Sequence, residues 1–266
     1  MPLISIITPV YQPVLVHLSE TVRCVAEQKL PSNWSVEWIV QEDASDRTVD
    51  EAVLSYDSVR YQANGSHLGP AATRNIALAR ARGELVQVLD QDDYLLPDAL
   101  NTLIPHFNNP SIHWATGQQD DLHEDGTRTT RASRLPFGPL APGLVNSAAI
   151  NRGGNWAVHC AGLMLRTEII RALGGWVASW GWGDDDIVMF AGLSEITHGY
   201  NDPTVTWLYR QHPGQLTRTA EIKRFSALGR QVALQRIIAM RSAEVQITTA
   251  RLHRQATPVA GPAEKG

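Results

Sequence analysis

Apolar and polar residues alternate along the first hundred residues with two different periods. Short runs rich in Ile, Val and Leu, bounded by turn residues, are typical of buried strands, and the segments between them repeat apolar residues at helical spacing. The predicted strands cover residues 3–10, 36–40, 59–62 and 85–89, and the predicted helices cover residues 15–28, 50–54 and 71–82. This alternation predicts an α/β fold in which a mostly parallel central sheet has helices on both faces.

Acidic residues follow two of these strands at their carboxyl ends. Asp43 lies just beyond the second strand, and Asp90-Gln91-Asp92-Asp93 follows the fourth. Aspartate is depleted in strands and costly to bury, and ligands of parallel sheets bind at the carboxyl ends of strands, so both places are candidate ligand sites. In an extended segment Asp90 and Asp92 would face the same side and could hold Mg²⁺ or Mn²⁺. A plain turn is the alternative, because aspartate is common in turns.

Composition excludes several classes of protein. The chain has 266 residues, 43% of them hydrophobic, which suits one domain with a sizeable core. Its formal net charge of -4 offers no basic excess, so we expect no nucleic-acid partner. No apolar run reaches the roughly 18 residues of a membrane span, and no leader-like segment precedes the first strand. We therefore expect no membrane span and a cytoplasmic location. Cys24 and Cys160 form no disulfide or zinc pattern and are expected in the core.

The second half of the chain has a weaker pattern. Residues 110–155 are rich in Gly, Pro, Asn and Thr and predict irregular strands and loops. Tryptophans gather after this region, where their faces could stack on sugar rings or fill a core. We assign Trp176 and Trp207 to the core, and we expect Trp180 and Trp182 to line a carbohydrate pocket.

Five short blocks stand in a definite order along the chain. They are Ser5-Ile6-Ile7-Thr8-Pro9-Val10-Tyr11, Glu42-Asp43-Ala44-Ser45-Asp46, the stretch from Asn64 to Asn75, Leu89-Asp90-Gln91-Asp92-Asp93 with Pro97, and Gly174-Gly175-Trp176 followed by Gly183-Asp184-Asp185-Asp186. Over residues 3–220 this order resembles the inverting glycosyltransferases of family 2, which have the Rossmann-like GT-A fold. The resemblance implies a catalytic domain at 1–220, with a nucleotide-binding half at 1–100 and an acceptor-binding half at 101–220.

The resemblance implies that the first four blocks bind the nucleotide of a sugar donor. The residues concerned are Thr8, Pro9, Tyr11, Asp43, Arg74, Asp90 and Gln91. Asp43 matches a residue that reads the base, although its block is one residue shorter than usual and lacks the usual glycine. Arg74 is expected to reach the nucleotide or its phosphates with its guanidinium group. A salt bridge on an exposed helix face is the alternative for Arg74.

The resemblance also implies a divalent cofactor, Mn²⁺ or Mg²⁺, and a general base. Asp92 matches a metal ligand, and Asp90 and His212 match residues that touch the metal or the donor beside it. The ion would offset the negative charge that grows on the departing diphosphate. The general base matches Asp184 or Asp185, of which we favour Asp184. Both could also serve simply as first-turn residues of a helix.

Residues 221–247 predict an amphipathic helix with several arginines, and residues 248–266 predict a disordered tail. We expect the helix to pack on the catalytic domain or to form a homodimer contact. Peripheral contact with an anionic membrane is the alternative.

Taken with the resemblance, these features imply a metal-dependent inverting glycosyltransferase. The donor would be a UDP-, dTDP- or GDP-sugar, and the acceptor a hydroxyl of a small molecule, natural product or cell-envelope glycan. A catalytically silent sugar-nucleotide-binding module is the alternative. A sugar-1-phosphate nucleotidyltransferase is disfavoured, because residues 5–11 contain neither the glycine nor the basic residue expected of its phosphate loop.

Overall fold

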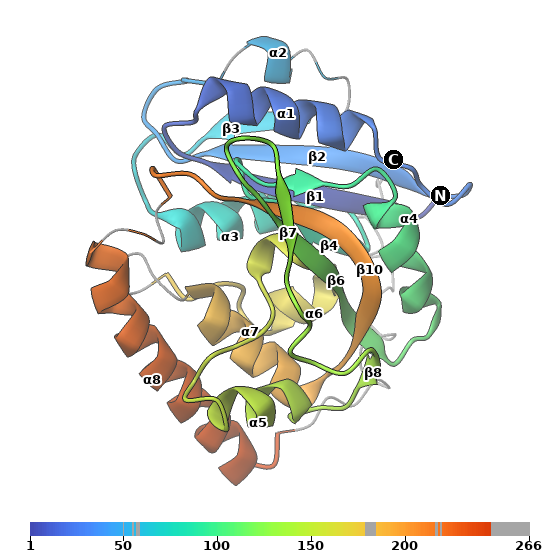
Figure 1. The fold of residues 1–266 in the computed structure, drawn as a ribbon, viewed down its shortest axis with the longest axis vertical. Coiled ribbons are helices and arrows are strands. Elements are labelled where there is room, and N and C mark those ends of the chain that lie inside the picture. The colour runs from blue at the N-terminus through green and yellow to red at the C-terminus, as the bar shows by residue number, and fades with distance from the viewer. Residues whose placement is uncertain are drawn as a thin grey trace, which may run out of the picture.

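The structure is a computed structural model that describes residues 1–49, 51–54, 56, 59–178, 185–215, 218 and 220–245. Within these residues one ten-stranded mixed sheet runs through the molecule, with helices on both faces (Figure 1). The roles expected for Trp180, Trp182 and Asp184, and the tail at 248–266, fall outside the described residues.

The N-terminal half of the sheet is parallel, as predicted. In the spatial order β3-β2-β1-β4, its strands are β1 (Leu3–Val10), β2 (Ser35–Glu42), β3 (Val59–Ala63) and β4 (Leu85–Val88). The helices of this half are α1 (Leu15–Ala26), α2 (Glu51–Leu54) and α3 (Pro70–Arg80). Ile6 of β1 lies beside both Trp38 of β2 and Gln87 of β4. The segments that carry Asp43 and Asp90 therefore leave the sheet at the same edge.

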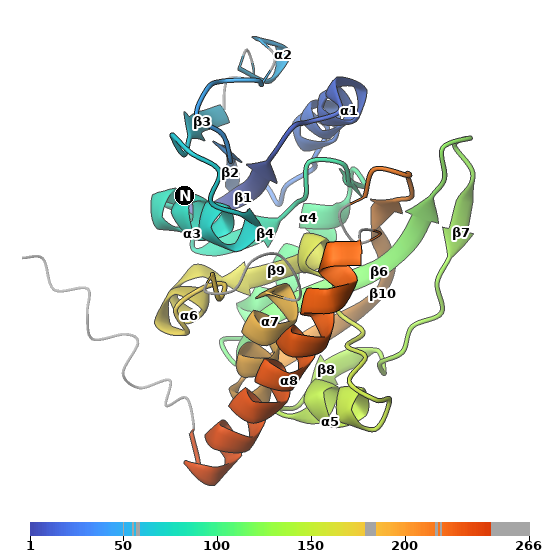
Figure 2. The same cartoon turned by 90° about the vertical axis from the view of Figure 1, so that its left-hand side faces the viewer.

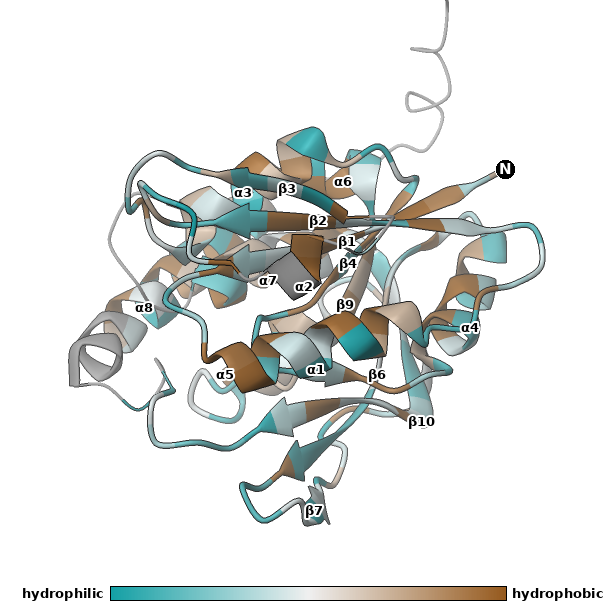
Figure 3. Ribbon diagram, turned by 90° about the horizontal axis from the view of Figure 1, so that it is seen from above, coloured by the Kyte–Doolittle hydropathy of each residue, from teal (hydrophilic) through white to brown (hydrophobic). Residues whose placement is uncertain are grey.

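Burial explains why these strands were legible in the sequence. β4 is buried at every position, and β1 at most positions, so both read as nearly continuous apolar runs. Coloured by hydropathy, β1 is brown for much of its length, whereas α1 carries both brown and teal segments (Figure 3). A helix at the surface needs only one apolar face.

The C-terminal half is mixed and was less well predicted. β9 (Leu163–Arg166) runs antiparallel between β4 and β6 (Ile112–Leu122), and β10 (His198–Arg210) runs parallel to β6. Three short strands complete the sheet, β5 (Tyr94–Leu95), β7 (Arg128–Thr130) and β8 (Gly138–Leu140).

β6 is longer and more regular than the irregular region predicted there. Its polar residues made it resemble a loop in the sequence. Some of these side chains form hydrogen bonds with the neighbouring strand instead of with solvent. The Nε2 of Gln118, for example, donates to the Oδ1 of Asn201 at 2.8 Å and to the carbonyl of Asp202 at 2.7 Å.

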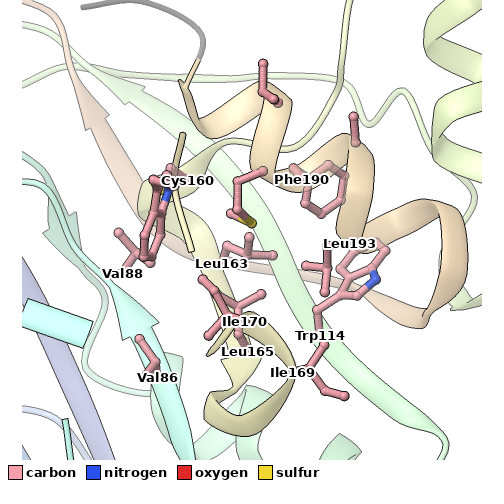
Figure 4. Close-up of a cluster of buried hydrophobic side chains, with 14 of the residues drawn as sticks. Val86, Val88, Trp114, Cys160, Leu163, Leu165, Ile169, Ile170, Phe190 and Leu193 are labelled. Atoms are coloured by element: carbon pink, nitrogen blue, oxygen red, sulfur yellow. The ribbon is translucent and has the colours of Figure 1, made fainter. Parts of the chain in front are cut away.

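Several shorter helical segments follow β4 in the part of the chain that the structure describes. They are α4 (Ala99–Leu103), the 3₁₀ helices at Ile104–Asn108 and Cys160–Gly162, α5 (Leu144–Ile150), α6 (Thr167–Ala172) and α7 (Asp185–Ile196). α7 covers one face of the sheet, where Phe190 and Leu193 pack with Leu165 of β9 (Figure 4). The ring of Phe190 meets that of Trp114 edge to face at 5.0 Å. Cys24, Cys160, Trp176 and Trp207 are all buried, as predicted.

The predicted C-terminal helix is α8 (Ala220–Ser242), which lies along the outside of α7 (Figure 2). Arg236 donates to the carbonyl of Val188 at 3.1 Å, and the Nε of Arg241 lies 2.6 Å from Glu195. The expected packing on the catalytic domain is thus confirmed, while a homodimer or membrane contact stays a prediction. Among the helices that the structure describes, none combines the length and apolarity needed to cross a bilayer.

Candidate active site

The segment after β4 forms a turn in which the N–H of Asp93 donates to the carbonyl of Asp90 at 3.2 Å. It is not extended, so the expectation that Asp90 and Asp92 point together from an extended strand was wrong. The turn is fixed by Asp93, which is buried and accepts the backbone N–H of Arg210 at 3.0 Å. Burial raises the pKa of Asp93 well above its ordinary value, and the nearby carboxylates add to the rise. The Nε of Arg210 donates to the carbonyl of Asp92 at 2.7 Å.

Gln91 ties this turn to the end of β1. Its Oε1 accepts the N–H of Tyr11 at 2.8 Å, and its Nε2 donates to the carbonyl of Tyr11 at 3.0 Å. Both ends of the amide are therefore engaged by backbone, and Gln91 positions Tyr11 instead of presenting its side chain to a nucleotide. The hydroxyl of Thr8 is likewise withdrawn into the core, where it accepts the indole N–H of Trp38 at 2.9 Å. Of the three residues expected at the end of β1, only Pro9 and Tyr11 have exposed surface.

Asp43 lies across from this turn and is almost fully buried. Its Oδ1 accepts the side-chain N–H of Asn64 at 3.0 Å and the backbone N–H of Leu68 at 2.6 Å. Its Oδ2 accepts the backbone N–H of Gly69 at 2.9 Å and lies 2.9 Å from the Nδ1 of His67. The carboxylate thus organises the loop that leads into α3.

Arg74 lies in the first half of α3 and is buried, so the alternative of a salt bridge on an exposed helix face is wrong. Its Nη2 lies 2.9 Å from the Oδ1 of Asp90, and its Nη1 lies 3.2 Å from the Oδ2 of Asp185. Arg74 therefore joins the turn after β4 to the start of α7. Its Nε is buried without a hydrogen-bond partner.

Asp185 begins α7 and is only 5% exposed. Burial raises its pKa to about 6, and the positive charge of Arg74 opposes that rise. A general base must reach the proton of an acceptor, whereas one oxygen of Asp185 faces Arg74 and the side chain is enclosed. These observations favour a structural role for Asp185.

His212 follows β10 and faces the turn. Its Nε2 lies 2.9 Å from the Oδ2 of Asp92, which brings together two of the three expected metal ligands. The third, Asp90, faces Arg74 instead. Among the described residues, no three His, Cys, Asp or Glu side chains are grouped closely enough to hold an ion by themselves. Carboxylate and imidazole are suitable ligands for Mn²⁺, and a substrate diphosphate commonly supplies the rest of such a shell, so the Asp92–His212 pair fits a metal bound with the donor.

Two residues that the sequence reasoning missed support this corner. The ring of His17 lies 5.2 Å from that of His212, and its Nδ1 is buried without a hydrogen-bond partner. Burial, aided by the charge of Arg210, lowers the pKa of His17. Arg210 also pairs with Glu20 of α1. Arg210 stands two residues before His212, which the sequence analysis singled out, whereas nothing in the sequence distinguishes His17.

An open hollow of about 360 Å³ adjoins His212. It is lined by His123, Glu124 and Asp125 of the turn between β6 and β7. Its other side is formed by residues that follow β10.

A parallel half-sheet thus carries carboxylates at one of its edges, and Arg74 joins one of them to the acidic start of α7. The sequence model of Glycosyl transferase family 2 matches residues 5–173, more than half of the chain, and the chain belongs to this family. The solved structure of S. aureus TarS 1-349 in complex with UDP-GlcNAc has the same fold, with a TM-score of 0.64 and 18% sequence identity, over 86% of this chain and 66% of that one. The same protein in complex with UDP gives a TM-score of 0.61 at 19% identity, over 80% and 61%.

Curated relatives agree with this assignment. An uncharacterized protein of Mycobacterium tuberculosis, MT1568, is 30% identical over 65% of this chain and 56% of its own length. A putative teichuronic acid biosynthesis glycosyltransferase of Bacillus subtilis, TuaG, is 30% identical over 51% of this chain and 54% of its own length. A GalNAc(5)-diNAcBac-PP-undecaprenol beta-1,3-glucosyltransferase of Campylobacter jejuni is 30% identical over 42% and 37%. The chain thus spans about half the length of the first of these relatives.

Proposed function

We propose that this glycosyltransferase is metal-dependent and inverting, and that it moves a sugar from a nucleoside-diphosphate sugar to an acceptor hydroxyl. The observation that carries the proposal is the gathering of Asp43, Asp92 with His212, and the start of α7 at one sheet edge. The first would bind the base, the second the diphosphate through a metal, and the third would receive the acceptor. Gln91 and Arg74 link these parts to one another.

UDP is the nucleotide that we favour, because two of the solved structural neighbours are complexes with UDP and UDP-GlcNAc. Asp43 would read the base by accepting a ring N–H, for which a carboxylate is suited. Tyr11, which is 37% exposed beside it, offers an aromatic face for stacking. The same arguments would extend to dTDP, whereas a GDP-sugar would need room for a purine.

Asp92 and His212 would hold the ion, Mn²⁺ or Mg²⁺. When bound, that ion would act as a Lewis acid that stabilises the charge on the leaving diphosphate. The two protein atoms already lie in contact at 2.9 Å, and a cation between them would replace a hydrogen bond. Asp90, which pairs with Arg74, would instead contact the ribose or the diphosphate of the donor.

Asp184 would serve as the general base. Asp185, its neighbour, is enclosed and faces Arg74, which leaves Asp184 as the better candidate for taking the acceptor proton. With no protein nucleophile proposed, a single in-line displacement would invert the anomeric centre. Trp180 and Trp182, four and two residues before Asp184, would stack on the acceptor.

The names of two relatives point to acceptors that are cell-envelope glycans, one in teichuronic acid biosynthesis and one linked to undecaprenol diphosphate. We propose a carbohydrate acceptor of this kind. A silent binding module is the competing function. It would bind UDP and UDP-sugars, but it would not cleave a UDP-sugar to UDP with any acceptor.

The test is release of UDP from a panel of UDP-sugars with Mn²⁺ and glycan acceptors, in wild type and in Asp92→Ala. The variant should lose turnover and the Mn²⁺-dependent part of UDP binding, because one hard oxygen ligand is removed from a small set. Asp98→Ala is the matched control, since Asp98 is an exposed carboxylate that pairs with Lys29 and not with His212. Full activity of Asp92→Ala, or of wild type in excess EDTA, would refute the metal proposal.

A further inference from the structure

The imidazole of His67 lies where a nucleobase is proposed to bind. Its ring stacks on that of Tyr11, with centroids 4.2 Å apart and an interplanar angle of 23°. Its Nδ1 lies 2.9 Å from the Oδ2 of Asp43. A flat, nitrogen-containing ring that stacks on an aromatic residue and meets this carboxylate makes the same two contacts as a bound base.

Three hydrogen bonds already use most of the acceptor capacity of Asp43. Its Oδ1 accepts from Asn64 and Leu68, and its Oδ2 accepts from Gly69. An ionised carboxylate has about four lone-pair sites, and the Nδ1 of His67, 2.9 Å from Oδ2, occupies the side that these hydrogen bonds leave open. A base can bond to this oxygen only after the imidazole leaves.

His67 is the partner of Asp43 best able to leave. Leu68 and Gly69 donate from the backbone, and Gly69 is the N-cap of α3 with a φ of +88° that favours glycine. Asn64 is also bonded to Thr73 at 2.8 Å. The side chain of His67, by contrast, is 35% exposed on the loop. A base also cannot enter between His67 and Tyr11, because an inserted ring would need about twice their present separation.

We propose that His67 is a specificity-determining residue that occupies the base subsite in the free protein and competes with the nucleobase for Asp43 and Tyr11. This inference rests on the proposed function, in which Asp43 reads the base of UDP. Donor binding then includes a displacement of His67, and only a base that bonds to Asp43 better than the imidazole does will displace it. His67 thereby affects which base the protein binds, and it does not affect the binding of the sugar or the phosphates.

The test compares dissociation constants of UDP and of inorganic pyrophosphate by calorimetry, with Mn²⁺, for wild type and His67→Ala. If the imidazole holds the subsite in nine of ten free molecules, its removal should lower the Kd of UDP about tenfold, because the apparent Kd scales with the inverse of the competent fraction. Pyrophosphate has no base, so its Kd should not change. Ser66→Ala, an exposed change on the same loop, should match wild type for both ligands.

A Kd of UDP that is equal or higher in His67→Ala than in wild type overturns the inference and leaves the proposed donor intact. Failure of UDP to bind to either protein overturns the proposed function and the inference together. A second measurement on wild type guards against a folding defect in the variant. The ring resonances of His67 should shift on adding UDP and lose their contact with Tyr11, whereas pyrophosphate should leave them in place; retained contact in the UDP complex contradicts the proposal.

Discussion

Replacing Arg74 by Gln should destabilise the protein by about 3 kcal/mol near pH 7.5, at the low end of what breaking a buried ion pair costs. Arg74 is 8% exposed and its two nitrogens face Asp90 at 2.9 Å and Asp185 at 3.2 Å. Its loss leaves Asp185 buried beside α7 with no positive partner. The low end applies because Asp185 can take up a proton, which limits the penalty of an unpaired charge.

The sign of the pH dependence follows from the pKa of Asp185. That pKa is about 6 in the folded protein, above its ordinary value of 3.8, so ionisation of Asp185 reduces stability as the pH rises through 6. Without Arg74 the pKa of Asp185 should rise further, because the charge that opposes the rise is gone. The penalty of Arg74→Gln should therefore be small near pH 5, where Asp185 is protonated in both proteins, and should grow above pH 6.

Urea unfolding followed by tryptophan fluorescence at several pH values measures this penalty as a change in the free energy of unfolding. The double variant Arg74→Gln/Asp185→Asn should recover much of the loss at pH 7.5, since no charge is then left unpaired in that pair. Arg152→Gln is the control, because Arg152 is exposed and donates to the carbonyl of Arg134 instead of facing a buried carboxylate. Additive effects within about 0.5 kcal/mol, or a penalty independent of pH, would refute the reasoning.

Two further predictions concern the donor and the base. Gln91→Glu keeps the size of the side chain but removes the donor to the carbonyl of Tyr11, so the Kd of UDP should rise several-fold with little change in unfolding; an unchanged Kd would mean that Tyr11 does not need this anchor. Asp184→Asn should lower turnover about 10²-fold or more with UDP binding preserved, since the amide cannot accept a proton. Asp185→Asn should lower turnover less, and the product should have inverted anomeric configuration. Wild-type turnover of Asp184→Asn would exclude it as the base.

The parallel half of the fold could be predicted because buried parallel strands appear in a sequence as apolar runs between turn residues. β6 has no such run, since polar residues such as Gln118 form their hydrogen bonds with β10, more than eighty residues further along the chain. Hydropathy reports burial and not pairing, and a polar central strand therefore resembles a loop. The same limit explains why the antiparallel insertion of β9 could not be foreseen.

Within the candidate site, positions were more predictable than partners. Asp43 and Asp90 were placed at one edge because strand ends can be read from the sequence, and in the structure both segments leave the sheet there, with Asp43 buried and Asp90 partly exposed. The pairing of Arg74 with Asp185 joins residues 111 apart in sequence, which no local spacing encodes. His67 lies inside a block that was singled out, yet the neighbouring sequence does not show whether its ring stacks on Tyr11 or is solvated.

The residues that link the site are different from those proposed to touch the substrates, and this division has a physical reason. A group that binds a ligand must keep an unfilled donor or acceptor or exposed surface, whereas a group that sets geometry is most effective when it is fully satisfied. Gln91 and Arg74 are of the second kind, each bridging two segments that would otherwise move independently. Asp43 has features of both kinds, because three hydrogen bonds fix its position while its Oδ2 still faces the place proposed for the base. The exposed imidazole of His67 now stands at that oxygen, and its departure would make room for the base.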